Sequence, residues 1–431
     1  MNHIGIRHEN KYKFERRTPI IPEHVSELIS RGISISVEQS EKRVFSDQEY
    51  KEAGAEIREN LTEADLIFGV KEMPEDYFEK NKAYLFFSHV IKGQPYNMPM
   101  LRNIINSGAT LIDYEKIEDQ DGQRLIFFGR YAGLAGMINT LWATGQRYKE
   151  RGVHSPLANL KQTYQYDSLD EARTSIKDVA EKINVHGLPE EMKPLVIAVT
   201  GDGNVSNGAM EILDLLPGPY ISADELKDGD YDRNQEIIKV NLLVEDYMVP
   251  EKDRPFDLQH YINFPDLYSS AIEDYLPNIN VLVNGIYWDE NYPRLITKEW
   301  LSKMDREGIL NLAVIGDITC DINGSVECTE TATAIEDPVF VYDPLEDSYE
   351  MGFEGSGLAV MAVDILPSEL PREASIHFSE ALKPYIKKMA ETDFSVSFED
   401  LSLPAPIKNA VVVHLGKLTP KYSYLENYLD I

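Results

Sequence analysis

The stretch that decides the fold is PLVIAVTGDGNVSNGAMEILDLLPG, from Pro194 to Gly218. It begins with an apolar run typical of a buried strand, continues with a glycine-rich turn, and ends in an amphipathic helical pattern. This order of elements opens a nucleotide-binding βαβ unit. Short apolar strands alternate with helical patterns over most of the remaining chain, which predicts an α/β architecture with largely parallel sheets.

The glycine-rich turn points to a dinucleotide site. Gly201 and Gly203 form a GxG motif directly after the strand and before the helix. Such glycines permit a tight turn and let backbone N–H groups approach a pyrophosphate at the helix N-terminus. Ser206 stands where the usual third glycine would be, and Gly208 follows two residues later. The alternative is a tight βα turn that binds no ligand.

The choice of dinucleotide depends on the residue at the end of the second strand of this unit. We predict that strand at GPYIS, from Gly218 to Ser222. An NAD site typically carries an acidic residue there, which binds the ribose 2′-hydroxyl. Ser222 would instead accommodate a 2′-phosphate without repulsion, so the sequence favours NADP(H). Asp224 follows closely, and NAD(H) is therefore the alternative.

Two further segments each end a predicted strand in a basic residue. GVKEMP (Gly69–Pro74) contains Lys71, and FFSHVIK (Phe86–Lys92) contains His89. Carboxyl ends of neighbouring parallel strands meet at one crevice, where α/β proteins bind ligands. A lysine and a histidine brought together there can exchange protons near neutral pH, because burial and mutual repulsion lower the pKa of a lysine. The alternative is a strand-end lysine beside a histidine satisfied in the core.

Composition narrows the class of protein. The chain has 431 residues, of which 43% are hydrophobic and 27% charged, as in an ordinary globular protein of two or three domains. Its net charge of −31 disfavours a nucleic-acid partner. No apolar run reaches the roughly 18 to 20 residues of a membrane span, and the N-terminal segment lacks the apolar region of a secretory signal. We therefore expect a cytoplasmic location.

No metal site is expected either. The only two cysteines, Cys320 and Cys328, are not spaced as zinc ligands, and the nine histidines show neither an HExxH pattern nor a cluster. The cysteines are expected to be reduced thiols.

The pattern of elements predicts the domain organisation. A first domain takes residues 1–135 together with about 370–431, to which a helix starting near Asp364 returns the chain. The long helical pattern from Tyr131 leads into a helical connector, 136–189, and the dinucleotide-binding domain spans 190–365. The acidic interval 227–266 is expected to be a surface insertion that contains a strand at IIKVNLLVE.

Seven motifs occur in order along nearly the whole chain. They are ERRTPIIPEHVSELI (15–29), GVKEMP (69–74), FFSHVIKGQPYNMP (86–99), RLIFFGRYAGLAGMINTLWA (124–143), TGDGNVSNGA (200–209), VNGIYWDENYPRLIT (283–297) and DILPSELPREAS (364–375). This set resembles the lysine–2-oxoglutarate reductase family (lysine-forming saccharopine dehydrogenase), in particular the reductase half of bifunctional aminoadipic semialdehyde synthase. It is more distantly similar to alanine dehydrogenase.

The resemblance implies two Rossmann-like domains that flank a cleft, with the C-terminal segment returning to the first domain. It also implies a reversible reaction in which lysine and 2-oxoglutarate condense to an imine that takes hydride from a reduced nicotinamide, giving saccharopine. Lys71 and His89 match the acid–base pair of the family, and Glu72 and Glu115 match carboxylates that tune its charge. The substrate-binding positions are Arg17, Lys92, Arg124 and Asp364, and the cofactor-contacting positions are Gly203, Asn204, Val205, Ser222 and Tyr287.

These roles agree with simple chemistry. Saccharopine carries three carboxylates, which guanidinium groups bind in bidentate fashion. Imine formation needs one proton removed from the lysine ε-ammonium and one supplied to the departing hydroxyl. The alternatives are surface ion pairs for Arg17 and Arg124, and solvated strand-end acids for Glu72 and Glu115.

Other functions stay open at this point. An alanine-dehydrogenase-like or opine-type enzyme would use another amine and 2-oxoacid, and a nucleotide-binding sensor or scaffold would have no activity. Lys71 and His89 together with Arg17 and Arg124 argue against the sensor. The bifunctional relatives continue into a saccharopine-cleaving half and this chain ends at Ile431, so we expect a separate enzyme to cleave saccharopine. The sequence indicates no oligomeric state.

Overall fold

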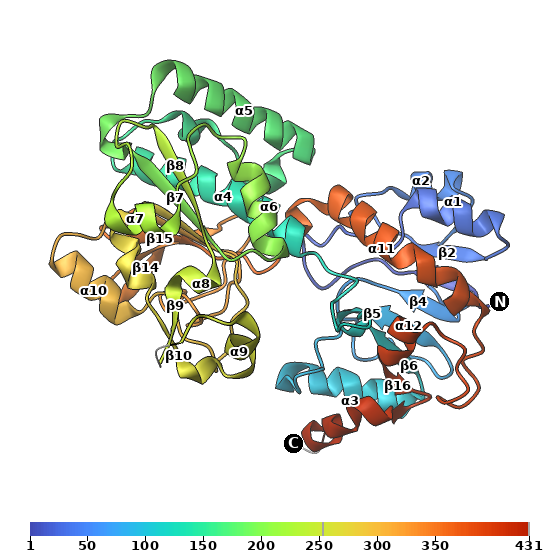
Figure 1. Ribbon diagram of the computed structural model, residues 1–431. Helices are drawn as coiled ribbons and strands as arrows, with labels where there is room; N and C mark the ends of the chain where they lie inside the picture. Colours follow the sequence, from blue (N-terminus) through green and yellow to red (C-terminus); the bar gives the residue numbers. More distant parts are fainter. Residues whose placement is uncertain (252–253, 430–431) are drawn as a thin grey trace. The chain divides into compact units, whose positions relative to one another are not determined.

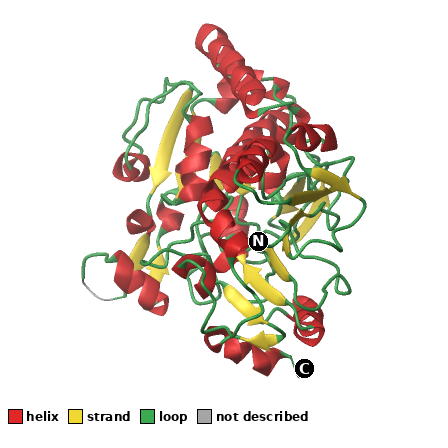
Figure 2. Cartoon of the chain, turned by 90° about the vertical axis from the view of Figure 1, so that its right-hand side faces the viewer, coloured by secondary structure: helices red, strands yellow, loops and turns green. Residues whose placement is uncertain are grey.

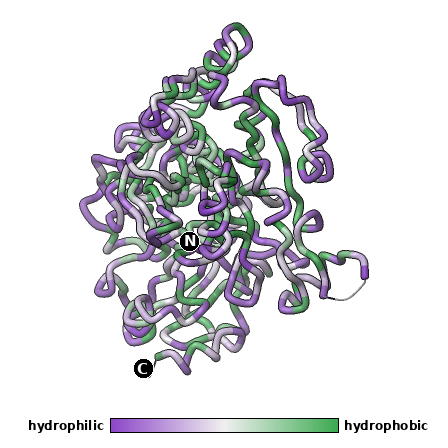
Figure 3. Tube along the Cα trace, turned by 90° about the vertical axis from the view of Figure 1, so that its left-hand side faces the viewer, coloured by the Kyte–Doolittle hydropathy of each residue, from purple (hydrophilic) through white to green (hydrophobic). Residues whose placement is uncertain are grey.

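The computed structural model describes residues 1–251 and 254–429 and divides the chain into two compact units (Figure 1). Unit 1 comprises Met1–Phe128 and the C-terminal segment from Pro371, and unit 2 comprises Gly129–Leu370. Each is an α/β unit of helices packed around a sheet (Figure 2). Hydrophobic residues concentrate on the buried strands, and hydrophilic residues on the loops (Figure 3).

Unit 1 contains one eight-stranded sheet in the order β17-β16-β6-β5-β4-β1-β2-β3. The six strands from β6 to β3 run parallel to one another. Strand β16 pairs antiparallel with β6, and β17 pairs antiparallel with β16. The strands are β1 (Ile4–Ile6), β2 (Ile35–Glu38), β3 (Glu56–Arg58), β4 (Leu66–Phe68), β5 (Ala83–Phe86), β6 (Thr110–Asp113), β16 (Val411–His414) and β17 (Lys417–Leu418). The helices are α1 (Pro22–Ser30), α2 (Asp47–Glu52), α3 (Met98–Ser107), α11 (Pro371–Glu391) and α12 (Ala405–Asn409), with 3₁₀ turns η1 (Pro95–Asn97), η2 (Tyr114–Lys116) and η10 (Pro420–Tyr428).

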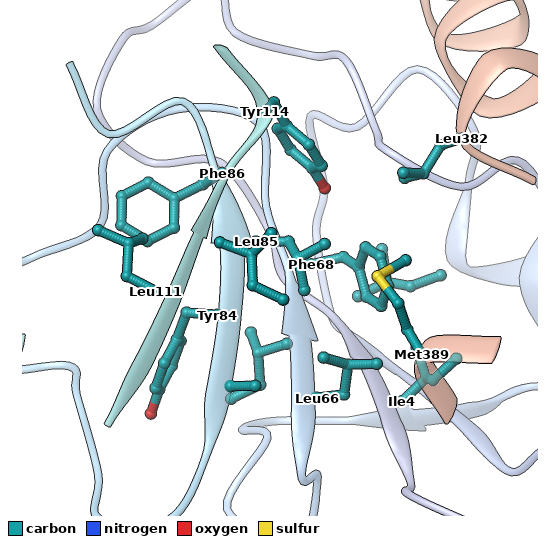
Figure 4. Packing of buried hydrophobic residues seen from close by; sticks show 14 of the residues in the cluster. Ile4, Leu66, Phe68, Tyr84, Leu85, Phe86, Leu111, Tyr114, Leu382 and Met389 are labelled. Carbon is teal, nitrogen blue, oxygen red and sulfur yellow. The ribbon is translucent and has the colours of Figure 1, made fainter. Parts of the chain in front are cut away.

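The core of unit 1 explains why the chain returns to it. The central strands β4 and β5 are buried along their whole length, as expected for parallel strands covered on both faces. Leu382 and Met389 of α11 lie over these strands in the same cluster as Phe68 and Leu85 (Figure 4). The prediction that the C-terminal segment rejoins the first domain is therefore confirmed.

Unit 2 contains a seven-stranded sheet in the order β14-β13-β15-β12-β11-β7-β8 and a two-stranded antiparallel sheet of β9 and β10. The strands are β7 (Leu195–Thr200), β8 (Ile237–Leu242), β9 (Met248–Pro250), β10 (Tyr268–Ser270), β11 (Val281–Asn284), β12 (Val314–Asp317), β13 (Val339–Asp343), β14 (Ser348–Met351) and β15 (Leu358–Met361). The helices are α4 (Gly129–Glu150), α5 (Leu169–His186), α6 (Asn204–Leu213), α7 (Ala223–Asp228), α8 (Val244–Tyr247), α9 (Leu258–Asn263) and α10 (Lys298–Arg306). The 3₁₀ turns are η3 (Pro156–Asn159), η4 (Thr163–Gln165), η5 (Glu190–Met192), η6 (Pro265–Leu267), η7 (Ile272–Asp274), η8 (Leu276–Asn278) and η9 (Leu366–Glu369).

Helix α4 packs closely on α6 through glycines. A Cβ on Gly133 would lie 1.9 Å from the carbonyl oxygen of Val205, and one on Gly208 would lie 2.1 Å from that of Arg130. Only glycine permits these approaches. This packing places α4, which we predicted to lead into a connector, within unit 2. Helix α5 belongs to the same unit.

The prediction that Gly218–Ser222 forms the second strand of the dinucleotide unit is wrong. The strand that pairs in parallel with β7 is β8, from Leu195 opposite Ile237 to Thr200 opposite Leu242. The predicted segment makes a single parallel bridge, at Tyr220, because Gly218 has a φ of +102° and Pro219 has no N–H to donate. The interval 227–266 is thus more than a surface insertion, since it supplies an edge strand of the sheet.

Candidate active site

The three strands β4, β5 and β6 bring the predicted catalytic segments of unit 1 to one edge of the sheet. Lys71 follows β4, His89 follows β5 and Glu115 follows β6. These strands are adjacent and parallel, with Phe68 opposite Leu85 and Phe86 opposite Asp113. Their carboxyl ends therefore lie side by side, and the predicted juxtaposition of Lys71 and His89 at this edge agrees with the topology.

His89 is oriented by a buried carboxylate. Its Nδ1 lies 2.8 Å from Oε1 of Glu72, which is only 7% exposed, and Nζ of Lys11 lies 2.7 Å from the same oxygen. Burial favours the neutral acid, but the hydrogen bond and charge of His89, aided by Lys11, lower the pKa of Glu72 to about 2. Glu72 is therefore an ionised, buried partner of His89 and not a solvated strand-end acid.

The backbone at His89 adopts an uncommon conformation. Its φ is +50°, in the left-handed region that few side chains adopt. The side-chain amide of Asn97 donates to the carbonyl oxygens of both Ser88 and His89, at 3.1 and 3.2 Å, and the hydroxyl of Ser88 donates to Asp113. Backbone strain of this kind persists only where the surrounding structure holds the residue in place, and it is concentrated at functional sites.

Lys71 is surrounded by groups from the segment that follows β1. Its Nζ lies 5.7 Å from the centroid of the Tyr12 ring, and its backbone N–H donates to Glu9 at 3.0 Å. Its charge helps to keep the pKa of Glu15 low, against the opposing effect of burial, with Arg17 contributing most of that lowering. Lys71 is thus held beside acidic groups on the segment after β1.

The two predicted arginines differ in their surroundings. Arg17 is 3% exposed, stacks 4.1 Å from the centroid of the Phe128 ring, and binds Glu15 through Nε and Nη2 at 2.8 and 2.5 Å. It forms a buried, bidentate ion pair, so the alternative of a surface pair is wrong for this residue. Arg124 is half-exposed and pairs with Glu115. Lys92 is also exposed, and its backbone N–H donates to Gln94.

Three functional candidates, Glu9, Lys11 and Glu15, were not predicted. All lie in the charged run HENKYKFERR after β1. Strand β1 pairs with β4, which places this run beside the segment that carries Lys71. The rule applied to the ends of β4 and β5 also places this run at the edge of a parallel sheet, but the sequence does not show that β1 is the neighbour of β4.

The glycine-rich turn of unit 2 fits a dinucleotide. Gly201 has a φ of +82°, and a Cβ on Gly203 would meet no atom within 4 Å, so the backbone before α6 stands open to a ligand. Asn204 and Val205 are the first residues of α6. The hydroxyl of buried Ser206 donates to the carbonyl oxygen of Thr200 at 2.7 Å, which explains how a serine replaces the third glycine.

The other predicted residues of unit 2 are spread over several loops. Tyr287 follows β11 and is 66% exposed, and Asp364 is exposed after β15. Ser222 lies at the N-cap of α7, where its hydroxyl accepts from the N–H of Glu225 and donates to the same side chain. Asp224 is exposed on the first turn of that helix.

Metal binding and membrane spanning each require a particular arrangement of residues. Over residues 1–251 and 254–429, no three His, Cys, Asp or Glu side chains are grouped so that they could hold a metal ion. Within the same ranges, no helix combines the length and the apolar character that crossing a membrane requires. Cys320 and Cys328 are free thiols.

Known proteins share this architecture. The family model for the alanine dehydrogenase/PNT N-terminal domain matches residues 5–135, and that for the C-terminal domain matches residues 257–421. Together the two models cover more than half of the chain. The chain belongs to the alanine dehydrogenase/PNT family. The solved structure of an L-alanine dehydrogenase aligns with 99% of this chain and 99% of its own chain. The TM-score is 0.63 and the sequence identity 18%, which shows that the two proteins share a fold.

More similar sequences in this family carry other names. Alpha-aminoadipic semialdehyde synthase from Mus musculus is 34% identical over 98% of the chain, and that from Arabidopsis thaliana is 38% identical over 98%. The chain spans about half the length of these relatives, 47% and 41%. Lysine-forming, NAD(+) saccharopine dehydrogenase from Yarrowia lipolytica is 28% identical over 90% of the chain and 93% of that protein. The resemblance seen in the motifs is confirmed.

Proposed function

We propose that this protein is a nicotinamide-dependent oxidoreductase that joins the ε-amine of L-lysine to 2-oxoglutarate, giving saccharopine, in a reversible reaction. The observation that carries the proposal is the His89–Glu72 hydrogen bond at the same sheet edge as Lys71. It supplies two groups that can exchange protons, one of them oriented by a buried acid. The names of the relatives supply the substrates.

The chemistry assigns each group a task. The lysine ε-ammonium loses a proton and its amine adds to the C2 carbonyl of 2-oxoglutarate; the resulting hydroxyl then takes a proton and leaves as water, so that a C=N bond forms. Lys71 and His89 remove and supply these protons. Glu72 holds Nδ1 of His89, which directs proton transfer to Nε2. A bound reduced nicotinamide supplies hydride to the imine carbon.

We assign the cationic side chains of unit 1 to two tasks, binding the substrate and positioning other groups of the protein. Arg124 and Lys92 are exposed enough to bind substrate carboxylates. Arg17 already gives two of its nitrogens to Glu15, so we propose that it positions Glu15 next to Lys71 and contributes less to substrate binding. Asp364 in unit 2 remains a proposed substrate-site residue. The proposed partners are the small-molecule substrates. We still predict a separate saccharopine-cleaving enzyme and a cytoplasmic location.

The first prediction concerns the substrates. The purified protein is expected to oxidise the reduced nicotinamide only when lysine and 2-oxoglutarate are both present, as followed by absorbance. Ornithine, one methylene shorter than lysine, and oxaloacetate, one methylene shorter than 2-oxoglutarate, are the matched control substrates. Turnover with ammonia and pyruvate but none with lysine would assign the alanine-dehydrogenase reaction instead. Tight nucleotide binding without turnover of any pair would assign a sensor.

The structure changes the cofactor preference that we propose. Glu245 is exposed just beyond the carboxyl end of β8, the true second strand, where an acid binds the ribose 2′-hydroxyl of NAD. Burial, followed by the charges of Glu245 and Asp224, raises the pKa of Asp246, so these carboxylates lie near one another. Such a cluster would repel a 2′-phosphate. We therefore propose NAD(H) as the preferred cofactor, with NADP(H) as the alternative.

The second prediction tests this assignment. Wild-type protein is expected to have a higher kcat/KM with NADH than with NADPH. Glu245→Ser is expected to lower the ratio of kcat/KM for NADH to that for NADPH about tenfold. This is the lower end of the effect of losing a hydrogen bond to a charged group, because Glu245 is exposed. Glu299→Ser, at an exposed position in the first turn of α10 in the same unit, is the matched control. A wild-type preference for NADPH would contradict the proposal. A ratio lowered by Asp224→Ser alone would move the role to Asp224.

A further inference from the structure

A buried carboxylate holds the backbone that carries Lys71. Glu9 is 4% exposed and lies in the segment after β1. Its Oε1 accepts the backbone N–H of Val70 at 2.7 Å, and its Oε2 accepts that of Lys71 at 3.0 Å. The two oxygens thus bind two consecutive N–H groups just beyond β4, in the stretch between the strand and Glu72.

The glycine before these residues makes room for the carboxylate. A Cβ on Gly69 would lie 3.3 Å from Oε1 of Glu9 and 2.8 Å from Cε of Met73. A side chain at this position would crowd both groups. The sequence GVKE therefore leaves space for Glu9 immediately before the two amides that it binds.

The charged and titratable groups around Glu9 come from several segments. Glu15 and Arg7 act on it directly, and Glu9 in turn influences Lys42 and buried Tyr114. Burial, the largest influence, and then the Glu15 carboxylate raise the pKa of Glu9 to about 7, whereas the two backbone hydrogen bonds and Arg7 lower it. Its proton therefore exchanges near neutral pH.

We propose that Glu9 is a positioning residue: its carboxylate form holds Lys71 and Glu72 in the arrangement that proton transfer needs. Only the carboxylate has two oxygens that both accept. A protonated Glu9, or an amide in its place, accepts one of the two N–H groups and turns a donor toward the other. Loss of one bond releases the strand end, and a small misplacement of a catalytic group can cost up to about 10² in rate.

Glu9→Gln tests the proposal, and Glu369→Gln is its matched control. Glu369 is also 4% exposed, with a pKa that burial raises to about 8, and it accepts the backbone N–H of Tyr164 and the amide of Asn139 in unit 2. We expect Glu9→Gln to lower kcat about tenfold with little change in the KM for the nicotinamide. The fall in wild-type kcat as pH drops through about 7 should be reduced in this variant, whereas Glu369→Gln should keep it.

Stability separates positioning from a structural role. The folded pKa of Glu9 is above its unfolded value of 4.5, so the folded state binds the extra proton and loses stability as pH rises from that value through about 7. Gln does not ionise, so the unfolding midpoint of Glu9→Gln at about pH 8 is expected to be no lower than that of wild type. A lower midpoint together with the lost activity would overturn the proposal, as would wild-type kcat with an unchanged pH profile.

The inference rests on the proposed function, and a second readout separates the two. Kinetics are measured with whichever amine and 2-oxoacid the wild-type protein turns over, so a wrong substrate does not affect the comparison. The rate at which an amine-selective reagent labels Lys71, followed by peptide mass spectrometry, needs no turnover. We expect Glu9→Gln to change this rate for Lys71 and not for Lys193 of unit 2; an unchanged rate at Lys71 would overturn the proposal even in a protein without activity.

Discussion

We expect Lys71→Met and His89→Asn each to lower kcat by about 10²–10⁴, the usual contribution of a general acid or base. Methionine keeps much of the length of lysine but cannot exchange a proton. Asparagine is preferred to glutamine at position 89 because φ is +50° there, and asparagine tolerates the left-handed region better than most residues. Nicotinamide affinity should be nearly unchanged, since neither residue lies on the turn at Gly201 and Gly203.

The measurement is kcat across a range of pH, with nucleotide affinity determined separately by titration. Lys116→Met and His3→Gln are the matched controls, because Lys116 pairs with Glu118 and His3 with Ser36, all in unit 1. Both controls should keep kcat and its pH profile. If Lys71→Met and His89→Asn also keep kcat and its pH profile, the alternative interpretation holds. Lys71 is then a strand-end lysine and His89 a core histidine, and neither is catalytic.

The second large effect is on stability. We expect Arg17→Ala to lower the free energy of unfolding by about 3–5 kcal/mol, because it removes the bidentate ion-pair partner of a buried carboxylate. Glu15 is fully buried and its carboxylate takes both Nε and Nη2 of Arg17. Denaturant unfolding measures this change. The double variant Arg17→Met with Glu15→Leu should recover most of the stability, since it removes both charges and keeps apolar volume.

Arg124→Ala is the matched comparison. Its ion pair with Glu115 is half-exposed, and such pairs contribute about 0–1 kcal/mol, so the unfolding midpoint should hardly change. The KM for 2-oxoglutarate should instead rise about tenfold, toward the lower end for a lost charged hydrogen bond. An Arg17→Ala variant with normal stability and a raised KM would show that Arg17 binds substrate directly. Equal changes in KM for 2-oxoglutarate and for the nicotinamide would indicate loss of fold integrity.

Local sequence patterns were enough to predict several strands and to locate the residues that follow them. Short apolar runs predicted β4, β5 and β7, and the GxG turn after β7 predicted a dinucleotide site at Gly201 and Gly203. Because parallel strands present their carboxyl ends at one edge, Lys71 and His89 could be brought together without a structure. These features are local in sequence, and local patterns specify them.

Which segments became neighbours depended instead on strand order in the folded sheet. The ladder from Leu195 to Thr200 pairs with β8, whereas Gly218–Ser222 makes only a bridge from Tyr220 to Lys239 of β8. This pairing moves the proposed ribose-contacting residue from Ser222 to Glu245. Likewise β1 lies beside β4, with Ile6 opposite Phe68, and this pairing carries Glu9, Lys11 and Glu15 to Lys71. Residues some 60 positions apart meet only through strand order, which packing of the whole sheet determines and no local pattern encodes.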